Sequence, residues 1–230
     1  MRIASWNCNG KFREKFKQIV NIAADIYVIQ ECENPANYRN TEYNNFASNY
    51  IWVGQNPNKG LAVFVKNNIH LRKNNWNSYY LRNFISANIN NEFDLVCVWA
   101  CKPYIEEYYR YQKINIANYN ENTIIIGDFN SNAIWDYKHN KRNHTNVVKE
   151  LESKKLISAY HYIFNEEQGK EKHNTFYLYR HLDKGYHIDY CFIEKNRIKN
   201  FKILHHEIWL NFSDHIPILV KIYKESEKYV

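Results

Sequence analysis

Glycine and proline are scarce in this chain, with 6 Gly and 4 Pro among 230 residues. Collagen-like and low-complexity chains contain far more of these residues, so the composition excludes both classes. No Pro-, Gly- or Ser-rich tract divides the sequence, and hydrophobic residues make up 45% of it. We therefore expect residues 1–230 to form a single globular domain with a substantial core.

Cysteine is also uncommon. The 5 cysteines are an odd number and include no Cys-x-x-Cys pair, whereas a disulfide framework or a zinc site needs paired or closely spaced thiols. Four of them, Cys8, Cys32, Cys97 and Cys191, lie in or beside apolar runs. We expect buried free thiols at these positions.

Long apolar runs are absent, and none approaches the length of a membrane-spanning helix. The N-terminus meets polar residues too early for a signal peptide, so we expect a cytoplasmic protein without a membrane partner. Acidic residues are fewer than basic ones, 24 against 31, which gives a net charge of +7. This excess favours a polyanionic partner, but scattered lysines fit a solvated surface equally well.

Short apolar segments alternate with helical patterns along the chain. Helical spacing runs from Phe12 to Ala23, from Tyr108 to Ala117 and from Val147 to Leu156. Strands are predicted at 2–7, 26–29, 50–53, 61–65, 84–89, 95–99, 123–126, 175–177, 187–193, 201–205 and 216–222. Many strands with few helices predict an α/β sandwich of mixed sheets rather than an alternating parallel fold.

Polar residues collect at the ends of three predicted strands. Asn7, Glu31 and the pair Asp128 and Asn130 each follow an apolar run. A carboxylate at the end of a buried strand is costly unless a metal ion or a cation compensates its charge. This pattern therefore indicates a metal or phosphate site at one sheet edge.

The segment Gly127-Asp128-Phe129-Asn130 is the most specific of these signals. Period-two alternation places Asp128 and Asn130 on one side and turns Phe129 to the core, while Gly127 permits a close approach of backbone or ligand. An Asx turn that simply ends a strand is the structural alternative.

A second set of polar residues lies near the C-terminus. Asp214 and His215 adjoin each other before the last strand, where a protonated His215 would offset charge on a phosphate in the transition state. Asp189, within an apolar strand, could hold His215 in the required tautomer. The alternatives are a surface turn stiffened by Pro217 and a structural ion pair at Asp189.

Five ordered motifs resemble those of the endonuclease/exonuclease/phosphatase superfamily, which includes exonuclease III, AP endonucleases and deoxyribonuclease I. They are Trp6-Asn7, Gln30-Glu31, Gly127-Asp128-Phe129-Asn130, Ile188-Asp189-Tyr190 and Ser213-Asp214-His215. The resemblance runs from residue 2 to about 222. It implies a four-layered α/β sandwich, in which two mixed β-sheets pack face to face with helices on the outside.

The resemblance also implies one or two Mg²⁺ or Mn²⁺ ions and a role for each motif residue. Glu31 would be the principal metal ligand, with Asn7 and Asp214 as auxiliary ligands. The remaining roles concern the reaction itself: Asp128 would position or deprotonate the attacking water, Asn130 would hold a phosphate oxygen, and His215, oriented by Asp189, would stabilise the transition state. Oxygen ligands of this kind suit Mg²⁺ or Mn²⁺ better than zinc.

Some positions depart from the family pattern. Asn9, a candidate substrate contact, stands where AP endonucleases carry an acid. The region after the strand at 95–99 occupies the place of a catalytic Tyr or His in the family; either Lys102 substitutes there as a phosphate contact, or Tyr104 fills the role. Lys102 fits an ordinary exposed lysine equally well. Thr175 and Arg180 lie in a segment similar to one near the family's substrate, with Arg180 a candidate phosphate clamp.

These features predict a Mg²⁺-dependent phosphodiesterase, with a nuclease acting on DNA or RNA as the leading function. DNA is only weakly favoured, because no sequence feature distinguishes the two substrates. Two alternatives remain. One is a phosphatase or phosphodiesterase acting on a small molecule, an inositol phosphate or a lipid head group, and the other is a non-catalytic nucleic-acid-binding module. The sequence does not distinguish endonucleolytic from exonucleolytic attack, or monomer from dimer.

Overall fold

The computed structural model describes residues 1–223, in which two six-stranded sheets carry the architecture. The first has the order β13-β14-β1-β2-β4-β3 and the second the order β5-β6-β7-β8-β12-β9. The pairs β1–β2 and β7–β8 are parallel and the others antiparallel. Both sheets are therefore mixed, as the sequence predicts.

The strands have the following bounds. The first sheet contains β1 (Arg2–Asn7), β2 (Ile26–Cys32), β3 (Tyr50–Asn56), β4 (Lys59–Val65), β13 (Ile198–Ile203) and β14 (Ile218–Ile222). The second contains β5 (Leu71–Lys73), β6 (Phe84–Ile89), β7 (Phe93–Trp99), β8 (Thr123–Asp128), β9 (Leu156–Ser158) and β12 (Asp189–Glu194). A separate two-stranded ribbon joins β10 (Phe176–Tyr177) to β11 (Gly185–Tyr186).

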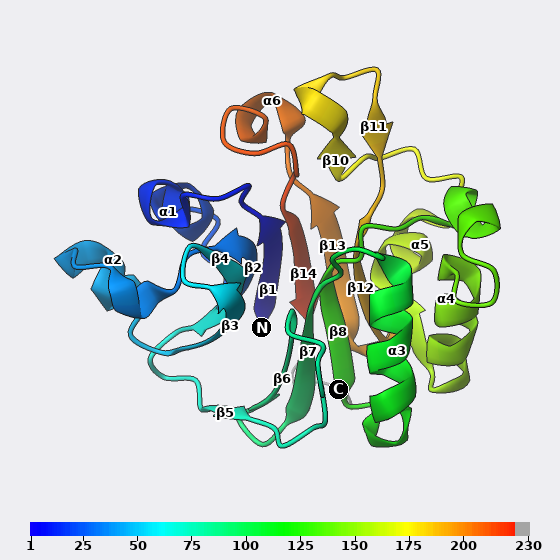
Figure 1. Cartoon of the computed structure of the whole chain (residues 1–230), viewed down its shortest axis with the longest axis horizontal. Helices are drawn as coiled ribbons and strands as arrows, with labels where there is room; N and C mark the ends of the chain where they lie inside the picture. Colours follow the sequence, from blue (N-terminus) through cyan, green and yellow to red (C-terminus); the bar gives the residue numbers. More distant parts are fainter. Residues whose placement is uncertain (224–230) are drawn as a thin grey trace.

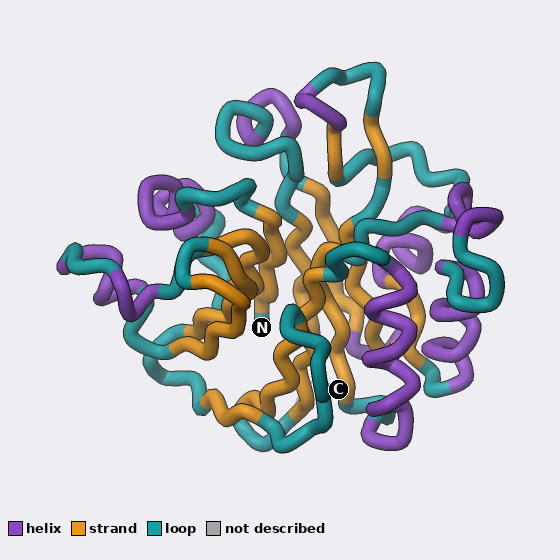
Figure 2. Tube along the Cα trace, in the orientation of Figure 1, coloured by secondary structure: helices purple, strands orange, loops and turns teal. Residues whose placement is uncertain are grey.

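Helices cover the outer faces of both sheets. Figure 1 shows α1 (Phe12–Val20) and α2 (Thr41–Phe46) outside the first sheet, and α3 (Ile105–Asn115) and α4 (His144–Ser153) outside the second. The short α5 (Ala159–Phe164) packs beside β12 and β13, and α6 (His206–Trp209) lies near the β10–β11 ribbon. In Figure 2 the helices flank the strands on either side, so the fold is the four-layered α/β sandwich.

The alternation of side chains along each strand produces these layers. In β8, Ile124 and Ile126 belong to the core between the two sheets, whereas Ile125 belongs to the core beneath α3 and α4. In β2, Val28 faces the core between the sheets and Tyr27 the core beneath α1 and α2. Strands buried on both faces need apolar residues at every position, which explains their continuous apolar runs.

The helix predictions are correct in position, but all three extend too far. Ala117 lies beyond α3, in a 3-10 helix at Ile116–Asn118. Ala23 lies beyond the end of α1, and Leu156 begins β9 instead of continuing α4. At these last two points the backbone turns left-handed, with φ of 53° at Ala23 and 63° at Lys155, which ends a right-handed helix. The ends of several strands also differ by a few residues from those predicted. Helices α2, α5 and α6 are too short for a periodic signal and were not predicted.

Two further expectations concern cysteine and membranes. All five cysteines are free, and Cys8, Cys32, Cys97 and Cys191 are buried, as predicted. Within residues 1–223, no helix has the length and apolar character needed to cross a membrane.

Candidate active site

Five strands bring polar residues to one edge of the sandwich. The parallel strands β1 and β2 end there at Asn7 and near Glu31, and β8 ends there at Asp128. Strand β12 is antiparallel to β8 and begins there, with Asp189 opposite Asp128. The segment before β14 adds His215. The directions of these strands thus bring residues that are far apart in the sequence to one edge of the sandwich.

Asn7 is the bridge between the two sheets. Its Nδ2 donates to Oδ2 of Asp128 at 3.0 Å and to Oε1 of Glu31 at 3.3 Å, while the side chain is almost fully buried. The backbone carbonyl of Asn7 accepts a hydrogen bond from the Ser213 hydroxyl, which in turn accepts from the His215 N–H. Asn7 therefore holds both acids and, through Ser213, the backbone of the histidine segment.

Glu31 occupies a β-bulge. It is the extra residue between Gln30 and Cys32, which pair with adjacent residues of β4, and its φ is 62°. Bulges re-aim side chains, and a left-handed non-glycine residue carries a strain of about 1–2 kcal/mol. The surrounding sheet thus holds the Glu31 carboxylate at the site edge.

Lys59 at the start of β4 is the cationic partner of Glu31. Its Nζ lies 2.8 Å from Oε2 of Glu31 and 5.7 Å from the ring centroid of Trp99. Lys59 was not predicted as a site residue. The only sequence signal is its place before Gly60, after the hairpin at 56–59, and it acquires a partner only through the bulge.

Asp128 is fully buried, yet several donors satisfy its carboxylate. The Asn130 backbone N–H donates to Oδ1 at 2.8 Å, and the Asn130 side chain donates to Oδ2 at 2.9 Å. The first bond is the Asx turn considered as the alternative, so the turn and the polar site coexist. Phe129 lies in the core, as predicted.

Gly127 permits close contact between β8 and β7. Its φ is 150°, and a Cβ atom built there would lie 2.0 Å from the Val98 carbonyl oxygen. The prediction of close backbone approach at Gly127 is confirmed.

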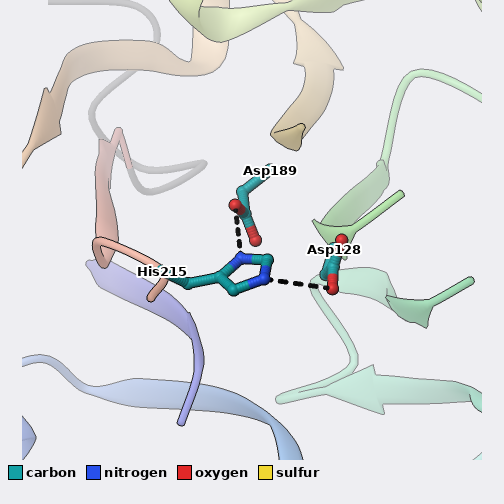
Figure 3. Close-up of side chains that lie close together, drawn as sticks. All are labelled: Asp128, Asp189 and His215. Atoms are coloured by element: carbon teal, nitrogen blue, oxygen red, sulfur yellow. Dashed lines mark hydrogen bonds and ion pairs between the residues drawn. The ribbon is translucent and has the colours of Figure 1, made fainter. Parts of the chain in front are cut away.

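His215 lies between two acids (Figure 3). Its Nδ1 is 3.0 Å from Oδ2 of Asp189, and its Nε2 is 3.9 Å from Oδ2 of Asp128. The Nδ1 bond fixes the ring and points Nε2 toward Asp128. Trp6 holds the same segment, because its Nε1 donates to the His215 carbonyl at 3.1 Å.

Burial and mutual charge shift the titration of this group. Burial raises the pKa of Asp128, the neighbouring Asp189 raises it further, and the charge of His215 opposes both. Burial by itself would lower the pKa of His215, but the charges of Asp189 and Asp128 outweigh it and raise the pKa. A cationic His215 beside Asp189 is therefore favoured.

Thr175 lies beneath the start of β12. It is fully buried, and its Oγ1 accepts the backbone N–H groups of Ile188 and Asp189, each at 3.0 Å. In this arrangement the buried Thr175 hydroxyl holds the start of β12, and its role as a substrate contact stays a prediction.

The other candidate substrate contacts lie around the edge. Asn9 is exposed, and its backbone N–H donates to Oδ1 of Asn7 at 3.0 Å. Lys102 and Arg180 are exposed. Tyr104 and Asn130 line a pocket of about 360 Å³ whose wall also includes Trp135 and Phe176. Tyr104 thus shares this pocket with Asn130, a polar residue of the site.

Two groups of side chains bear on metal binding. Asn7 donates to Glu31, whereas Oδ1 of Asp214 lies 3.3 Å from the Ser213 hydroxyl, whose proton goes to the Asn7 carbonyl at 2.7 Å. Within residues 1–223, no hydrogen bond joins the Asp214 carboxylate to Asn7 or Glu31. Among the same residues, Asp128, Asp189 and His215 place their ligand atoms within 4.8 Å of one another. Since Asp189 already binds Nδ1 of His215, and hard cations prefer oxygen, the donor set around Glu31 fits Mg²⁺ or Mn²⁺ better.

A lysine that the sequence did not single out joins two parts of this edge. Lys15 in α1 donates from Nζ to the Cys8 carbonyl at 2.8 Å and to the Phe212 carbonyl at 2.7 Å. It thereby ties the loop after β1 to the segment that carries Ser213 and His215.

Comparison with known proteins gives one family and several similar structures. The model of the Endonuclease/Exonuclease/phosphatase family matches residues 4–215. No curated protein matches the chain by sequence. A 3′ phosphatase from Neisseria bound to a product DNA hairpin has a TM-score of 0.68 at 16% identity, covering 97% of this chain and 99% of that one.

Two further solved structures are similar. An AP endonuclease from Archaeoglobus fulgidus has a TM-score of 0.70 at 16% identity and covers 96% of this chain and 99% of that one. The catalytic domain of APE2 from Xenopus laevis has a TM-score of 0.69 at 15% identity and covers 96% of this chain and 91% of that one. At these identities the likeness shows the fold.

Proposed function

The chain belongs to the endonuclease/exonuclease/phosphatase family, and from this premise we propose that it hydrolyses phosphodiester bonds of nucleic acid with the help of Mg²⁺ or Mn²⁺. One observation carries the proposal. Asn7 joins Glu31 to Asp128, and Asp128 faces a histidine held by a second acid. A metal ligand, a base and a cationic donor at a single edge suit attack of water on a phosphate.

Asp128 is the proposed base. Asn7 and Asn130 donate to its carboxylate and fix its orientation, so that it can accept a proton from the attacking water. Asn130 also donates to the Ala100 carbonyl at 3.2 Å, which anchors its amide beside the position proposed for a phosphate oxygen.

His215 is the proposed electrophilic donor. Asp189 holds Nδ1, so Nε2 remains available to donate to a phosphate oxygen as negative charge develops. Asp189 acts through His215 and is a positioning residue.

Glu31, together with Asn7 and Asp214, would hold the divalent cation. When bound, such an ion would polarise the phosphate and offset its negative charge. Lys59 already places a positive charge 2.8 Å from Oε2 of Glu31, whereas Asn7 binds the other carboxylate oxygen, Oε1.

Nucleic acid is the proposed substrate, with DNA favoured over RNA. The net charge of +7 suits a phosphate backbone. One similar structure is a 3′ phosphatase bound to a DNA hairpin, and another is an AP endonuclease. Removal of a 3′ phosphate is therefore the second candidate reaction.

A panel of substrates tests the proposal. Purified protein would be incubated with plasmid, single-stranded DNA, abasic duplex, 3′-phosphorylated DNA, RNA and inositol phosphates, with Mg²⁺, Mn²⁺ or EDTA. We expect cleavage of DNA that requires a divalent cation and falls about 10²- to 10⁴-fold in Asp128→Asn.

Glu194→Gln is the matched control, because β12 begins at Asp189 in the site and ends at Glu194, at the far end of the same strand. Cleavage of inositol phosphates with nucleic acids left intact would refute the nuclease assignment. Binding of nucleic acid without any cleavage, equal in wild type and Asp128→Asn, would instead identify a binding module.

A further inference from the structure

A second pocket, of about 330 Å³, lies beside the proposed catalytic edge. It is formed by β3, by the segment 74–83 between β5 and β6, and by residues of β6 and α3. Its volume is at the lower end of the range for small-ligand pockets, about 300–1,000 Å³. We propose that this pocket binds one nucleotide of a single strand that extends from the scissile bond, an inference that rests on the proposed nuclease function.

The charge of the pocket suits a phosphate. Lys73 and Arg82 contribute to its lining, and no carboxylate does. Within residues 1–223, no ion pair or hydrogen bond engages either of these cationic side chains. Two unpaired cations beside one concave surface attract a polyanion and leave their donors available to it.

Aromatic side chains supply surfaces for a base. Trp52 and Trp76 line the pocket together with Tyr79, which is 73% exposed. A base can stack on such a ring irrespective of its identity, and each stacked base contributes about 1–3 kcal/mol. Aromatic and cationic side chains in one pocket match the two parts of a nucleotide.

Two glycines leave the space in which the Trp52 ring packs. A Cβ atom at Gly54 or at Gly60 would lie 2.5 Å from atoms of that ring, so the indole lies flat over two glycines. Its Nε1 also donates to the Cys32 carbonyl at 3.2 Å. The ring is therefore positioned before any ligand binds, which reduces the entropy lost on binding.

The segment that carries Tyr79 is anchored on both sides. The Leu81 N–H donates to the Ser78 carbonyl at 2.8 Å, and Asn115 donates to the Asn77 carbonyl at 2.8 Å. Leu81 itself is 2% exposed. These bonds fix the turn that presents the exposed Tyr79 ring at the pocket.

One wall residue of the pocket, Trp52, binds the bulge that carries Glu31. Cys32, whose carbonyl binds Trp52, directly follows Glu31 in the bulge. Lys59, whose Nζ binds Glu31, directly precedes Gly60, and Gly60 pairs with Gly54 of the pocket wall. A strand could thus pass from the proposed catalytic site across Lys59 into the pocket.

Equilibrium binding in EDTA tests this inference without turnover. Fluorescence anisotropy would measure the Kd of the full chain for a fluorescein-labelled oligothymidine and for a backbone of equal length without bases. We expect Lys73→Gln/Arg82→Gln to weaken binding of both probes about tenfold and to reduce the dependence of Kd on salt. Tyr79→Ser should weaken only oligothymidine binding, about fivefold.

Lys155→Gln/Lys195→Gln is the matched control. Both lysines are exposed. Lys155 precedes Leu156 and Lys195 follows Glu194, and these two residues pair at the end of β12 that is far from Asp189. Equal weakening by the two double variants would overturn the inference, and so would displacement of oligothymidine by equimolar thymidine monophosphate, which would indicate a pocket for free nucleotides.

The outcomes also separate this inference from the proposed function. Binding that depends on the pocket in a protein that cleaves nothing would refute the nuclease proposal alone. Cleavage of DNA by a protein whose pocket variants bind like the wild type would refute the pocket alone.

Discussion

Asp189 begins β12 of the second sheet and His215 lies in the segment before β14 of the first, yet Oδ2 of Asp189 lies 3.0 Å from Nδ1 of His215. Asp189 is buried at the start of β12, and its backbone N–H donates a hydrogen bond to the buried hydroxyl of Thr175. His215 is held through its own backbone by Ser213 and Trp6. Separate contacts hold each partner, so the two side chains are already in hydrogen-bonding position before a substrate binds, as preorganised catalysis requires.

Asp189→Asn tests whether this pair serves catalysis. The amide keeps the shape of the carboxylate but no longer stabilises a cationic His215, so we expect kcat to fall about 10²- to 10⁴-fold with KM nearly unchanged. Steady-state kinetics on the best DNA substrate would measure both constants. A variant that loses thermal stability but retains kcat would assign Asp189 a structural role, and Glu194→Gln on the same strand should leave kcat as it is.

Lys59→Gln tests competition for Glu31. The lysine shares the Glu31 carboxylate at 2.8 Å, so its charge opposes binding of a divalent cation there. Because about half of the Lys59 side chain is exposed, solvent reduces this opposition to about 1 kcal/mol, and we expect Mn²⁺ to bind about fivefold more tightly.

Titration of Mn²⁺ by electron paramagnetic resonance would measure this affinity without turnover. Glu31→Gln is the reference and should weaken Mn²⁺ binding strongly. Unchanged affinity in Lys59→Gln, with loss of affinity in Glu31→Gln, would show that the lysine does not oppose the metal.

Much of the fold and part of the site followed from local patterns in the sequence. Asn7, Glu31 and Asp128 each follow an apolar run. A continuous apolar run predicts a strand buried on both faces, and the first polar residue after it marks where the strand ends. The positions of these three side chains were predictable, because parallel strands deliver their ends to one edge. Their chemical roles remain proposals.

The bulge at Glu31 and the partner at Lys59 could not be predicted in the same way. A bulge depends on the register between β2 and β4, which no local pattern encodes. Thr175 shows the opposite limit: its type suits a substrate contact, but the fold places it beneath Asp189. Contacts set by register and packing require the structure.

Gly127→Ala tests the close contact between β8 and β7. The new Cβ would meet the Val98 carbonyl oxygen at 2.0 Å, which is backbone and cannot move aside without disturbing the pair β7–β8. We expect a loss of about 3 kcal/mol or more in the free energy of unfolding, measured by urea denaturation. Gly10→Ala is the matched control, since it also has positive φ but no atom within 4 Å, and it should cost about 1 kcal/mol. Equal losses in both variants would show that backbone conformation matters and the contact does not.

His144 predicts a loss of stability in mild acid. It is fully buried, and burial lowers its pKa to about 4 from an unfolded value of 6.5. Between pH 6.5 and pH 4 His144 is therefore protonated in the unfolded chain but neutral in the folded chain, and the free energy of unfolding falls as pH drops through this window. From pH 7 to pH 5 this single group should cost about 2 kcal/mol. Burial lowers the pKa of His187 to about 4 as well, so His187 adds a loss over the same pH range in every variant compared below. Glu171, whose pKa is lowered to about 2, contributes a loss only below its unfolded value of 4.5 and does not interfere.

The measurement is the urea midpoint of wild type, His144→Gln and the control His181→Gln across this pH range. His144→Gln loses the bond to Gln168 and should be less stable at pH 7, but the group can no longer titrate. Its stability should therefore fall about 2 kcal/mol less than that of wild type between pH 7 and pH 5. His181 is exposed, so His181→Gln should follow wild type. Parallel curves for all three proteins would mean that His144 is protonated equally in both states, and the buried histidine could then have no part in acid unfolding.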